Sequence, residues 1–185
     1  MSDAPLTRAP ATLDHAGIAA RVPHAGAMCL LESLLRWDAD EIECAIVGHT
    51  DAAHPLRERA RAAGEGEQDL GLPAPCAIEY AAQAMALHAS LRASSNAAAG
   101  AEPSPGFLAS AREVRLHVPR LDTATGPLRV TARRQAGDTR QAIYRFALCD
   151  ARGQILVEGR ATVVLNSPIP SPRPAAGPAP SAESF

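Results

Sequence analysis

The sequence predicts an α+β fold in which an antiparallel sheet wraps around one long central helix. An apolar, alanine-rich stretch at 76–93 has the length of a helix, and it is followed by segments whose apolar residues recur at every second position. Such segments form strands, and short turns between them make neighbouring strands antiparallel. Because an apolar helix must bury its surface, we expect the sheet to hold it in its concave face.

The predicted helix has clear limits in the sequence. Pro73 and Pro75 precede it, and proline suits a first helical turn because its missing N–H would have no partner there. The polar cluster Ser94-Ser95-Asn96 is expected to end the helix, since such side chains compete for backbone hydrogen bonds.

The strands are predicted from the same alternation. Before the helix, residues 41–46 alternate, and 28–36 have the apolar density of a strand, although their leucines would also suit a short helix. Turns are expected at 136–138 and 150–153, where glycine and aspartate cluster. Four strands are predicted after the helix, at 113–118, 128–132, 143–148 and 155–165.

One folded unit is expected over residues 13–166, a length sufficient for a hydrophobic core. Residues 1–12 are rich in Ala, Pro and Thr, and residues 167–185 repeat Pro, Ala and Ser. Segments with so little to bury cannot offset the entropy lost on ordering, so both ends are predicted to be disordered.

Composition and charge argue against several classes of protein. The net charge of -2 provides no basic field for nucleic acid. No apolar run approaches the roughly 20 residues that span a bilayer. The N-terminus lacks the features of a signal peptide, so a cytoplasmic location is expected. The scattered cysteines form no Cys-x-x-Cys pair, which favours reduced thiols over a disulfide framework or a zinc site.

Glu79 is the strongest indication of chemistry in this chain. It places a carboxylate in an apolar helix, with Gln83 one turn further along the same face. Burial of a carboxylate is costly, so such a group marks a hydrogen-bonded structural role or a tuned acid or base. A position on a helix surface that faces water is the alternative, and the residues alone leave it open.

Two motifs are similar to those of a known family. Residues 22–32 (Val-Pro-His-Ala-Gly-Ala-Met-Cys-Leu-Leu-Glu) resemble its proline-histidine segment. Residues 72–74 (Leu-Pro-Ala), followed by Glu79 and Gln83, resemble its Leu-Pro-Gly, Glu-x-x-x-Gln helix. The chain thus resembles the hot-dog fold 3-hydroxyacyl-acyl-carrier-protein dehydratases, most closely the branch associated with aryl polyene biosynthesis. The resemblance covers about 17–165 and implies a single hot-dog domain.

The resemblance implies an acid–base pair that dehydrates a 3-hydroxyacyl thioester. His24 and Glu79 are its two members, and Gln83 supports them. A histidine suits removal of the α-proton, and a partly buried carboxylate suits the departure of the hydroxyl or a shared role. The helix start offers N–H groups and a positive dipole to the thioester oxygen, and the amides of Cys76 and Ala77 are expected nearest to it.

The choice of histidine stays open. The fatty-acid members of the family carry theirs in a Gly-His-Phe-Pro segment ahead of the helix, and residues 64–68 at the corresponding place hold no histidine. His49 and His54 are the alternative bases, although both also fit solvated loop positions. A surface position is expected for His88 on the helix, where it could line a dimer contact.

The connection at 50–72 is long for a compact domain and carries Arg57, Arg59 and Arg61. These arginines could meet the phosphate of a pantetheine arm or an acidic carrier protein. The run Arg-Glu-Arg-Ala-Arg also fits a solvated helical turn, which is the interpretation that we favour.

The predicted function is a dehydratase of carrier-bound 3-hydroxyacyl chains in polyene or fatty-acid-like synthesis. By resemblance, its partners are an acyl carrier protein and a second hot-dog subunit, either a copy of itself or a sister chain, since hot-dog enzymes build their sites across a dimer interface. No metal or cofactor is expected besides the phosphopantetheine that carries the substrate. Two alternatives remain: an acyl thioesterase, in which a carboxylate near the helix start activates water, and a non-catalytic acyl-binding subunit of a synthase complex.

Overall fold

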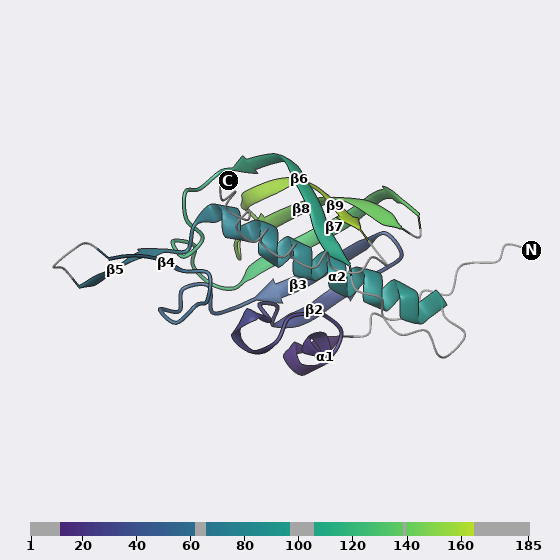
Figure 1. The fold of residues 1–185 in the computed structure, drawn as a ribbon, viewed down its shortest axis with the longest axis horizontal. Coiled ribbons are helices and arrows are strands. Elements are labelled where there is room, and N and C mark those ends of the chain that lie inside the picture. Colours follow the sequence, from purple (N-terminus) through teal and green to yellow (C-terminus); the bar gives the residue numbers. More distant parts are fainter. Residues whose placement is uncertain (1–11, 62–65, 97–105, 139, 165–185) are drawn as a thin grey trace, which may run out of the picture.

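Helix α2 (Ala77–Asn96) lies across the face of a seven-stranded antiparallel sheet (Figure 1). The computed structural model describes residues 12–61, 66–96, 106–138 and 140–164. The strand order is β1-β2-β3-β7-β8-β9-β6. The predicted α+β fold is therefore confirmed. The strand bounds are Leu13–Asp14 (β1), Ser33–Trp37 (β2), Glu41–Ile46 (β3), Phe107–Leu116 (β6), Leu128–Gly137 (β7), Gln141–Cys149 (β8) and Ile155–Val164 (β9).

The described part of the chain starts with β1 and the short helix α1 (His15–Ala19), neither of which the sequence pattern predicts. Residues 1–11 and 165–185, where nearly all of the predicted disorder falls, lie outside the described residues, so the domain limits stay a prediction. None of the helices in the described ranges is long and apolar enough to cross a membrane.

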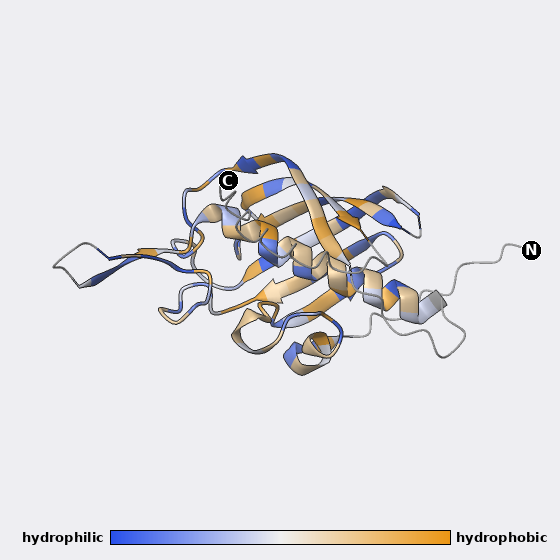
Figure 2. Ribbon diagram, in the orientation of Figure 1, coloured by the Kyte–Doolittle hydropathy of each residue, from blue (hydrophilic) through white to orange (hydrophobic). Residues whose placement is uncertain are grey.

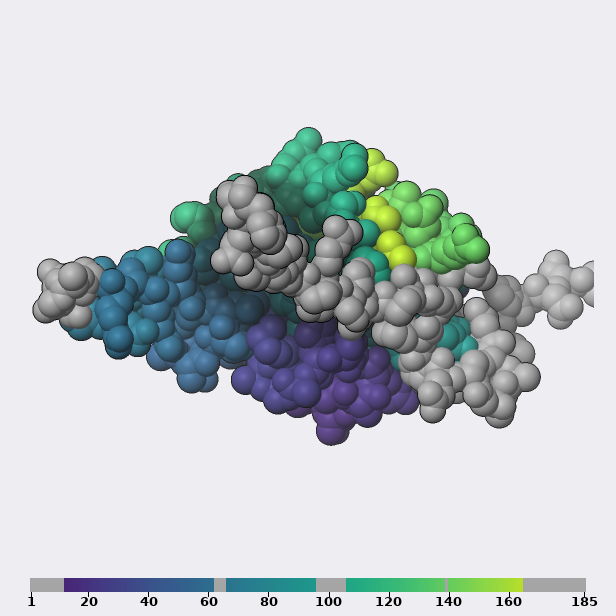
Figure 3. Space-filling view, in the orientation of Figure 1, coloured from purple at the N-terminus to yellow at the C-terminus, as the bar shows by residue number. Residues whose placement is uncertain are grey.

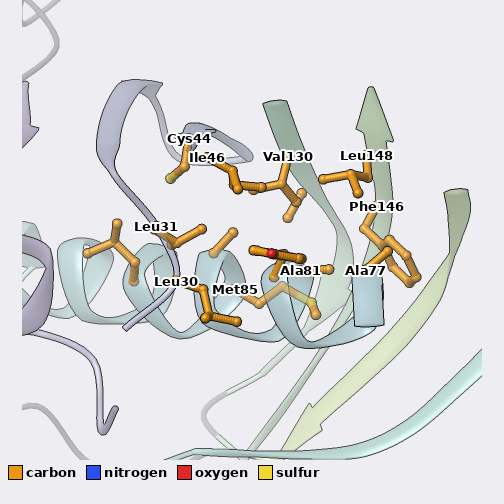
Figure 4. Packing of buried hydrophobic residues seen from close by; sticks show 14 of the residues in the cluster. Leu30, Leu31, Cys44, Ile46, Ala77, Ala81, Met85, Val130, Phe146 and Leu148 are labelled. Atoms are coloured by element: carbon orange, nitrogen blue, oxygen red, sulfur yellow. The ribbon is translucent and has the colours of Figure 1, made fainter. Parts of the chain in front are cut away.

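The core forms between α2 and the sheet. Buried residues occur on nearly every side of α2 over its first four turns, rather than along one stripe. Ala77, Ala81 and Met85 belong to one cluster with side chains that point inward from the sheet, among them Val130 and Phe146 (Figure 4). A helix that is apolar on all sides is a core helix, so any charged residue on it needs an explanation.

Strands β3, β7, β8 and β9 confirm the predicted alternation, whereas the strand predicted at 113–118 is wrong in its bounds, because β6 begins at Phe107 and ends at Leu116, which is 48% exposed. On β3, Ile42, Cys44 and Ile46 are buried, and each faces a buried residue of β7 across the ladder. Such cross-strand neighbours on one face build the core side of a sheet. Hydrophobic and hydrophilic residues accordingly alternate along the strands (Figure 2). The turn predicted at 150–153 joins β8 to β9, as expected.

The strand predicted at 28–36 is wrong over its first half. That part begins in a short 3-10 turn, η1 (Gly26–Met28), and β2 starts well after it. The reason lies in α2, because the carbonyl of Met28 and the amide of Leu30 bond the side chain of Gln83. Backbone groups that are occupied by a side chain cannot pair with a neighbouring strand.

The long connection before α2 forms a hairpin of β4 (Glu58–Arg61) and β5 (Glu67–Gly71), so the predicted helical turn is wrong. The hairpin projects away from the sheet (Figures 1 and 3). At its base, the guanidinium of Arg57 pairs with the carboxylates of Asp69 and Asp122. The other two arginines of the connection lie on β4 and are exposed. These contacts join positions far apart in sequence, which a local charge pattern cannot reveal.

Candidate active site

His24 and Glu79 meet at the first turn of α2. His24 follows Pro23 in the loop between α1 and η1, and Glu79 belongs to the first turn of the helix. Nε2 of His24 lies 3.0 Å from Oε1 of Glu79. The two side chains are 26% and 32% exposed, so a small molecule can reach both. Glu79 is therefore a hydrogen-bonded carboxylate rather than an isolated surface charge.

Gln83 holds this carboxylate in place. Its side chain is fully buried. Nε2 donates to Oε1 of Glu79 at 2.9 Å and to the carbonyl of Met28 at 2.8 Å, while Oε1 accepts from the amide of Leu30 at 2.9 Å. Both N–H groups and the oxygen of the amide are thus in use. One side chain connects the carboxylate to the loop that carries His24.

The surroundings of His24 indicate which ring nitrogen carries the proton. Nδ1 is buried and has no hydrogen-bond partner in the described structure. An N–H at that place would be an unpaired buried donor, which costs about 1–3 kcal/mol. A proton on Nε2 avoids this cost and places the N–H on the nitrogen that lies 3.0 Å from Oε1 of Glu79. We therefore assign to His24 the tautomer with its proton on Nε2, the nitrogen next to the carboxylate of Glu79.

The two amides expected to meet a substrate oxygen are engaged in the turn before α2. In the 3-10 turn η2 (Ala74–Cys76), the amide of Cys76 donates to the carbonyl of Pro73 at 3.0 Å, and the amide of Ala77 donates to carbonyls of the turn. An oxyanion at this point would have to share these hydrogen bonds. The positive end of the helix dipole adds to the attraction for an anion. The oxyanion role of these two amides stays a prediction.

The segment that leads into α2 is held by the loop at 119–122, between β6 and β7. The amide of Leu121 donates to the carbonyl of Leu72 at 2.8 Å, and the amide of Ala74 donates to the carbonyl of Pro119 at 3.0 Å. These bonds pair the two segments like short strands and fix the direction in which the helix begins.

Asp122 reinforces this attachment and was not singled out by the sequence. Its side chain is only 6% exposed and accepts hydrogen bonds from Arg120, Arg57 and the amide of Leu72. The Arg120 guanidinium, followed by the Leu72 amide, holds the pKa of Asp122 well below its usual range. Gly71 has a φ of +90°, and a Cβ there would collide with the Arg120 guanidinium.

His54 is buried against α2 and not solvated as predicted. Its Nε2 lies 2.8 Å from the hydroxyl of Tyr80, and its Nδ1 accepts from the amide of Leu56 at 3.2 Å. Burial lowers the pKa of His54, and the nearby charge of Arg57 adds to this effect. Both ring nitrogens are therefore in use, and His54 anchors its loop to the helix residue that follows Glu79.

His49 is also buried and lies away from the acid–base pair. Its Nε2 bonds the carbonyl of Ala124 at 3.0 Å. It lines a cavity of about 420 Å³ formed by residues 47–50 and 122–127, whose lining includes neither member of the pair. Of the three candidate histidines, only His24 contacts Glu79 among the residues that the structure describes.

His88 is a further buried polar residue, so its predicted surface position is wrong. Its Nδ1 lies 3.0 Å from the hydroxyl of Tyr144, and its Nε2 bonds the carbonyl of Asp38 at 2.9 Å. Burial lowers the pKa of His88. The apolar surroundings of this residue in the helix sequence were the available signal, because a helix that is apolar all round leaves no exposed face.

The arrangement at the start of α2 can transfer protons. A carboxylate and an imidazole in direct contact can each accept or donate a proton and can pass one between them. Within 12–61, 66–96, 106–138 and 140–164, no group of three or more His, Cys, Asp or Glu side chains could hold a metal ion.

Comparisons with known proteins place the chain in context. The model of a family described as "ApeP-like: ApeP dehydratase" matches residues 16–170. None of the curated proteins matches the chain. The structure of the dehydratase heterocomplex ApeI:P from Xenorhabdus doucetiae is 21% identical over 80% of this chain and 90% of that chain, with a TM-score of 0.65. The thioesterase HI1161 from Haemophilus influenzae is 11% identical over 73% of this chain and 77% of that chain, with a TM-score of 0.48. The first similarity confirms the predicted hot-dog fold.

Proposed function

Since the chain belongs to the ApeP-like dehydratase family and is a dehydratase, we propose that it removes water from 3-hydroxyacyl thioesters on an acyl carrier protein, in polyene or related acyl-chain synthesis. The observation that supports this substrate class is the contact of 3.0 Å between His24 and Glu79 on the edge of an otherwise apolar core. Elimination of water next to a thioester needs an acid and a base on one side of the substrate.

The proposed reaction moves one proton. The Cα–H and Cβ–O bonds break, the Cα=Cβ double bond forms, and the hydroxyl leaves as water with the proton of Nε2, which the α-proton then replaces. In the proposed resting state, the carboxylate of Glu79 can accept a proton, and the Nε2–H of the tautomer assigned above can donate one. We propose that Glu79 takes the α-proton while His24 protonates the hydroxyl, and that the new proton of Glu79 passes to Nε2 as water leaves. The pair then returns to its initial state.

This division of roles reverses the initial expectation that the histidine takes the α-proton. Negative charge that develops on the thioester oxygen would be met at the start of α2, where the amides of Cys76 and Ala77 and the helix dipole are the proposed stabilising groups. The reaction is redox-neutral, and both proton transfers are assigned to side chains. The proposal therefore includes no cofactor besides the phosphopantetheine that carries the substrate.

Mass spectrometry of a 3-hydroxyacyl carrier protein tests the proposal. We expect the wild type to remove the mass of one water, and His24→Ala and Glu79→Gln to abolish this loss. His49→Ala is the matched control, since His49 is a buried histidine outside the pair, and it should keep the activity if it folds. Release of carrier thiol without an enoyl product would instead assign a thioesterase. An unchanged substrate with folded, carrier-binding wild type would favour the non-catalytic alternative.

We also propose that the protein acts in the cytoplasm. We further propose that a second hot-dog subunit pairs along β6. The similar structure from Xenorhabdus doucetiae is a heterocomplex. In this chain β6 is an outer strand of ten residues, whereas the strand at the other edge, β1, has two. An unpaired outer strand offers a row of backbone donors and acceptors to another chain. Size-exclusion chromatography with light scattering would reveal a homodimer, and co-purification with a co-expressed sister subunit would reveal a heterocomplex.

A further inference from the structure

We infer that each chain carries a complete acid–base pair of its own, so that a partner subunit supplies neither the histidine nor the carboxylate. The inference rests on the proposed function for its meaning and on intrachain geometry for its support. His24 and Glu79 of one chain already lie 3.0 Å apart. This differs from the expectation that a hot-dog enzyme completes its site with a residue from across the dimer interface.

The loop that carries His24 is fixed to its own α2. The residues on both sides of this histidine, Val22 before it and Cys29–Leu31 after it, are buried in the core cluster that includes the helix. A loop anchored at both ends within one core cannot extend to another subunit without exposing apolar surface. Exposure of one large aliphatic side chain costs about 1.5–3 kcal/mol.

The carboxylate is fixed to the same loop by Gln83. This amide bonds Glu79 on one side and the backbone of Met28 and Leu30 on the other. The distance between acid and base is therefore set by three hydrogen bonds within one chain. Rotation of Glu79 toward a partner would leave a buried N–H of Gln83 without its acceptor, a cost of about 1–3 kcal/mol.

If the acid–base pair is complete in one chain, the site of each subunit transfers protons independently of its partner. A partner subunit could still cover the partly exposed side of the pair and shape the binding surface for the acyl chain. It would not contribute a group that gains or loses a proton. In an assembly with a sister subunit, this chain would therefore dehydrate its substrate even when every histidine and carboxylate of the sister's own site is replaced.

A complementation experiment separates the two arrangements. Copies with His24→Ala and copies with Glu79→Gln are co-expressed with different tags, and assemblies that hold one of each are isolated by two affinity steps. We expect the mixed assembly to be no more active than either variant alone. If the pair formed between chains, one of the two sites of a mixed dimer would be intact, and about half of the wild-type activity would return.

A chemical test covers the case in which the chain does not associate with itself. His24→Cys/Glu79→Cys is made in a background where the two partly exposed cysteines, Cys76 and Cys149, are serine. A short reagent that bridges two thiols is then applied, to this chain alone and to its complex with any co-purified subunit. We expect a bridge within one chain, seen as an unchanged mass on a denaturing gel and a linked peptide pair by mass spectrometry.

The matched control replaces His49 instead of His24, since His49 lies in a separate cavity, and it should give no bridge to position 79. Bridging that doubles the mass on the gel, or a failure to bridge a folded His24→Cys/Glu79→Cys protein, would overturn the inference. The reagent reports the distance between positions 24 and 79 and does not depend on turnover. Its result therefore stands even if the wild type proves not to dehydrate the proposed substrate.

Discussion

Oε1 of Glu79 accepts a hydrogen bond from the amide of Gln83 and lies 3.0 Å from Nε2 of His24. These two contacts fix the position of the carboxylate oxygen relative to the imidazole. The same geometry gives the histidine the role of a donor, because its other nitrogen is buried without a partner in the described structure. At the scale of residues, the chemistry of the site is therefore set by which atom holds the shared proton.

Replacement of His24 by glutamine tests this assignment. A glutamine can present an N–H toward Glu79 but cannot act as a base. Loss of an acid or base group lowers rates by about 10²–10⁴-fold, and we expect His24→Ala to fall in this range. His24→Gln should retain roughly tenfold more activity than His24→Ala if the N–H is what matters, since a hydrogen bond to a charged group is worth about 1.5–3 kcal/mol. Equal rates for the two variants would show that the N–H next to Glu79 contributes nothing by itself and that the loss comes from the missing proton transfer, since glutamine is neither an acid nor a base. Single-turnover kinetics provides the measurement.

Gln83→Leu should weaken both the fold and the catalysis. The substitution leaves the amide of Leu30 and the carbonyl of Met28 without their partner inside the protein. Each unsatisfied buried group costs about 1–3 kcal/mol, and urea unfolding should show a loss of this order. Gln68→Leu, at an exposed position on β5, is the control and should change the free energy of unfolding by less than about 0.5 kcal/mol. A stable Gln83→Leu protein with the wild-type rate would contradict the positioning role.

At the scale of elements, α2 and strands β7, β8 and β9 could be predicted because their signal is local, whereas only the end of β6 falls in the strand predicted at 113–118. Alternation along β3 and β7 and the proline pair before α2 each depend on neighbouring residues only. The β4–β5 hairpin could not be predicted in this way, since Arg57 is paired with Asp69 and Asp122, distant in sequence. The hydrogen bonds of Gln83 to the backbone of residues 28–30 likewise join positions far apart in sequence. Glu79 was found because a carboxylate in an apolar helix is conspicuous, whereas Asp122 lies in a loop where aspartate is ordinary.

Asp122→Ala should loosen the segment that leads into α2. It removes the acceptor that Leu72, Arg57 and Arg120 share and leaves the mostly buried Arg57 with only Asp69. The buried amide of Leu72 loses its acceptor, which costs about 1–3 kcal/mol and sets the expected loss. Urea unfolding measures it.

The control for this variant is Glu113→Ala, which breaks the exposed pair of Glu113 with Arg160. Exposed pairs contribute about 0–1 kcal/mol, so this change should be small. We also expect Asp122→Ala to lower kcat more than it raises KM, because the start of the catalytic helix moves while the acyl-binding surface does not. Equal losses of stability in the two variants would show that Asp122 contributes no more than a surface charge.

At the scale of the whole molecule, α2 connects the active site at its first turn with a buried polar cluster further along the helix. There His88 packs between Tyr144 and Trp37, and its ring nitrogens bond the Tyr144 hydroxyl and the Asp38 carbonyl. A proton added to His88 would place a second N–H against the hydroxyl and a charge in the core. The stability of the entire fold is thus linked to the protonation of a residue remote from the catalytic pair.

Stability should consequently fall as the pH drops below about 6.5, the pKa of histidine in an unfolded chain. Burial lowers the pKa values of His54 and His88 in the folded protein, so below pH 6.5 the unfolded chain binds protons that the folded chain does not. The free energy of unfolding then rises with pH in this window and levels off above it. The lowered pKa values of Asp38, Asp69 and Asp122 add a separate loss as the pH falls through about 4.

Urea unfolding at a series of pH values from 8 to 5 measures this dependence, and His88→Gln identifies its source. The variant should be less stable than the wild type at pH 8, because glutamine fills the site less well. It should lose less additional stability on acidification, since one group that resists protonation is gone. Gln68→Leu, at an exposed position without a titratable side chain, is the control and should keep the wild-type pH dependence. A pH dependence that is the same in His88→Gln and in the wild type would show that the buried cluster does not couple folding to pH, and that His54 alone carries the effect.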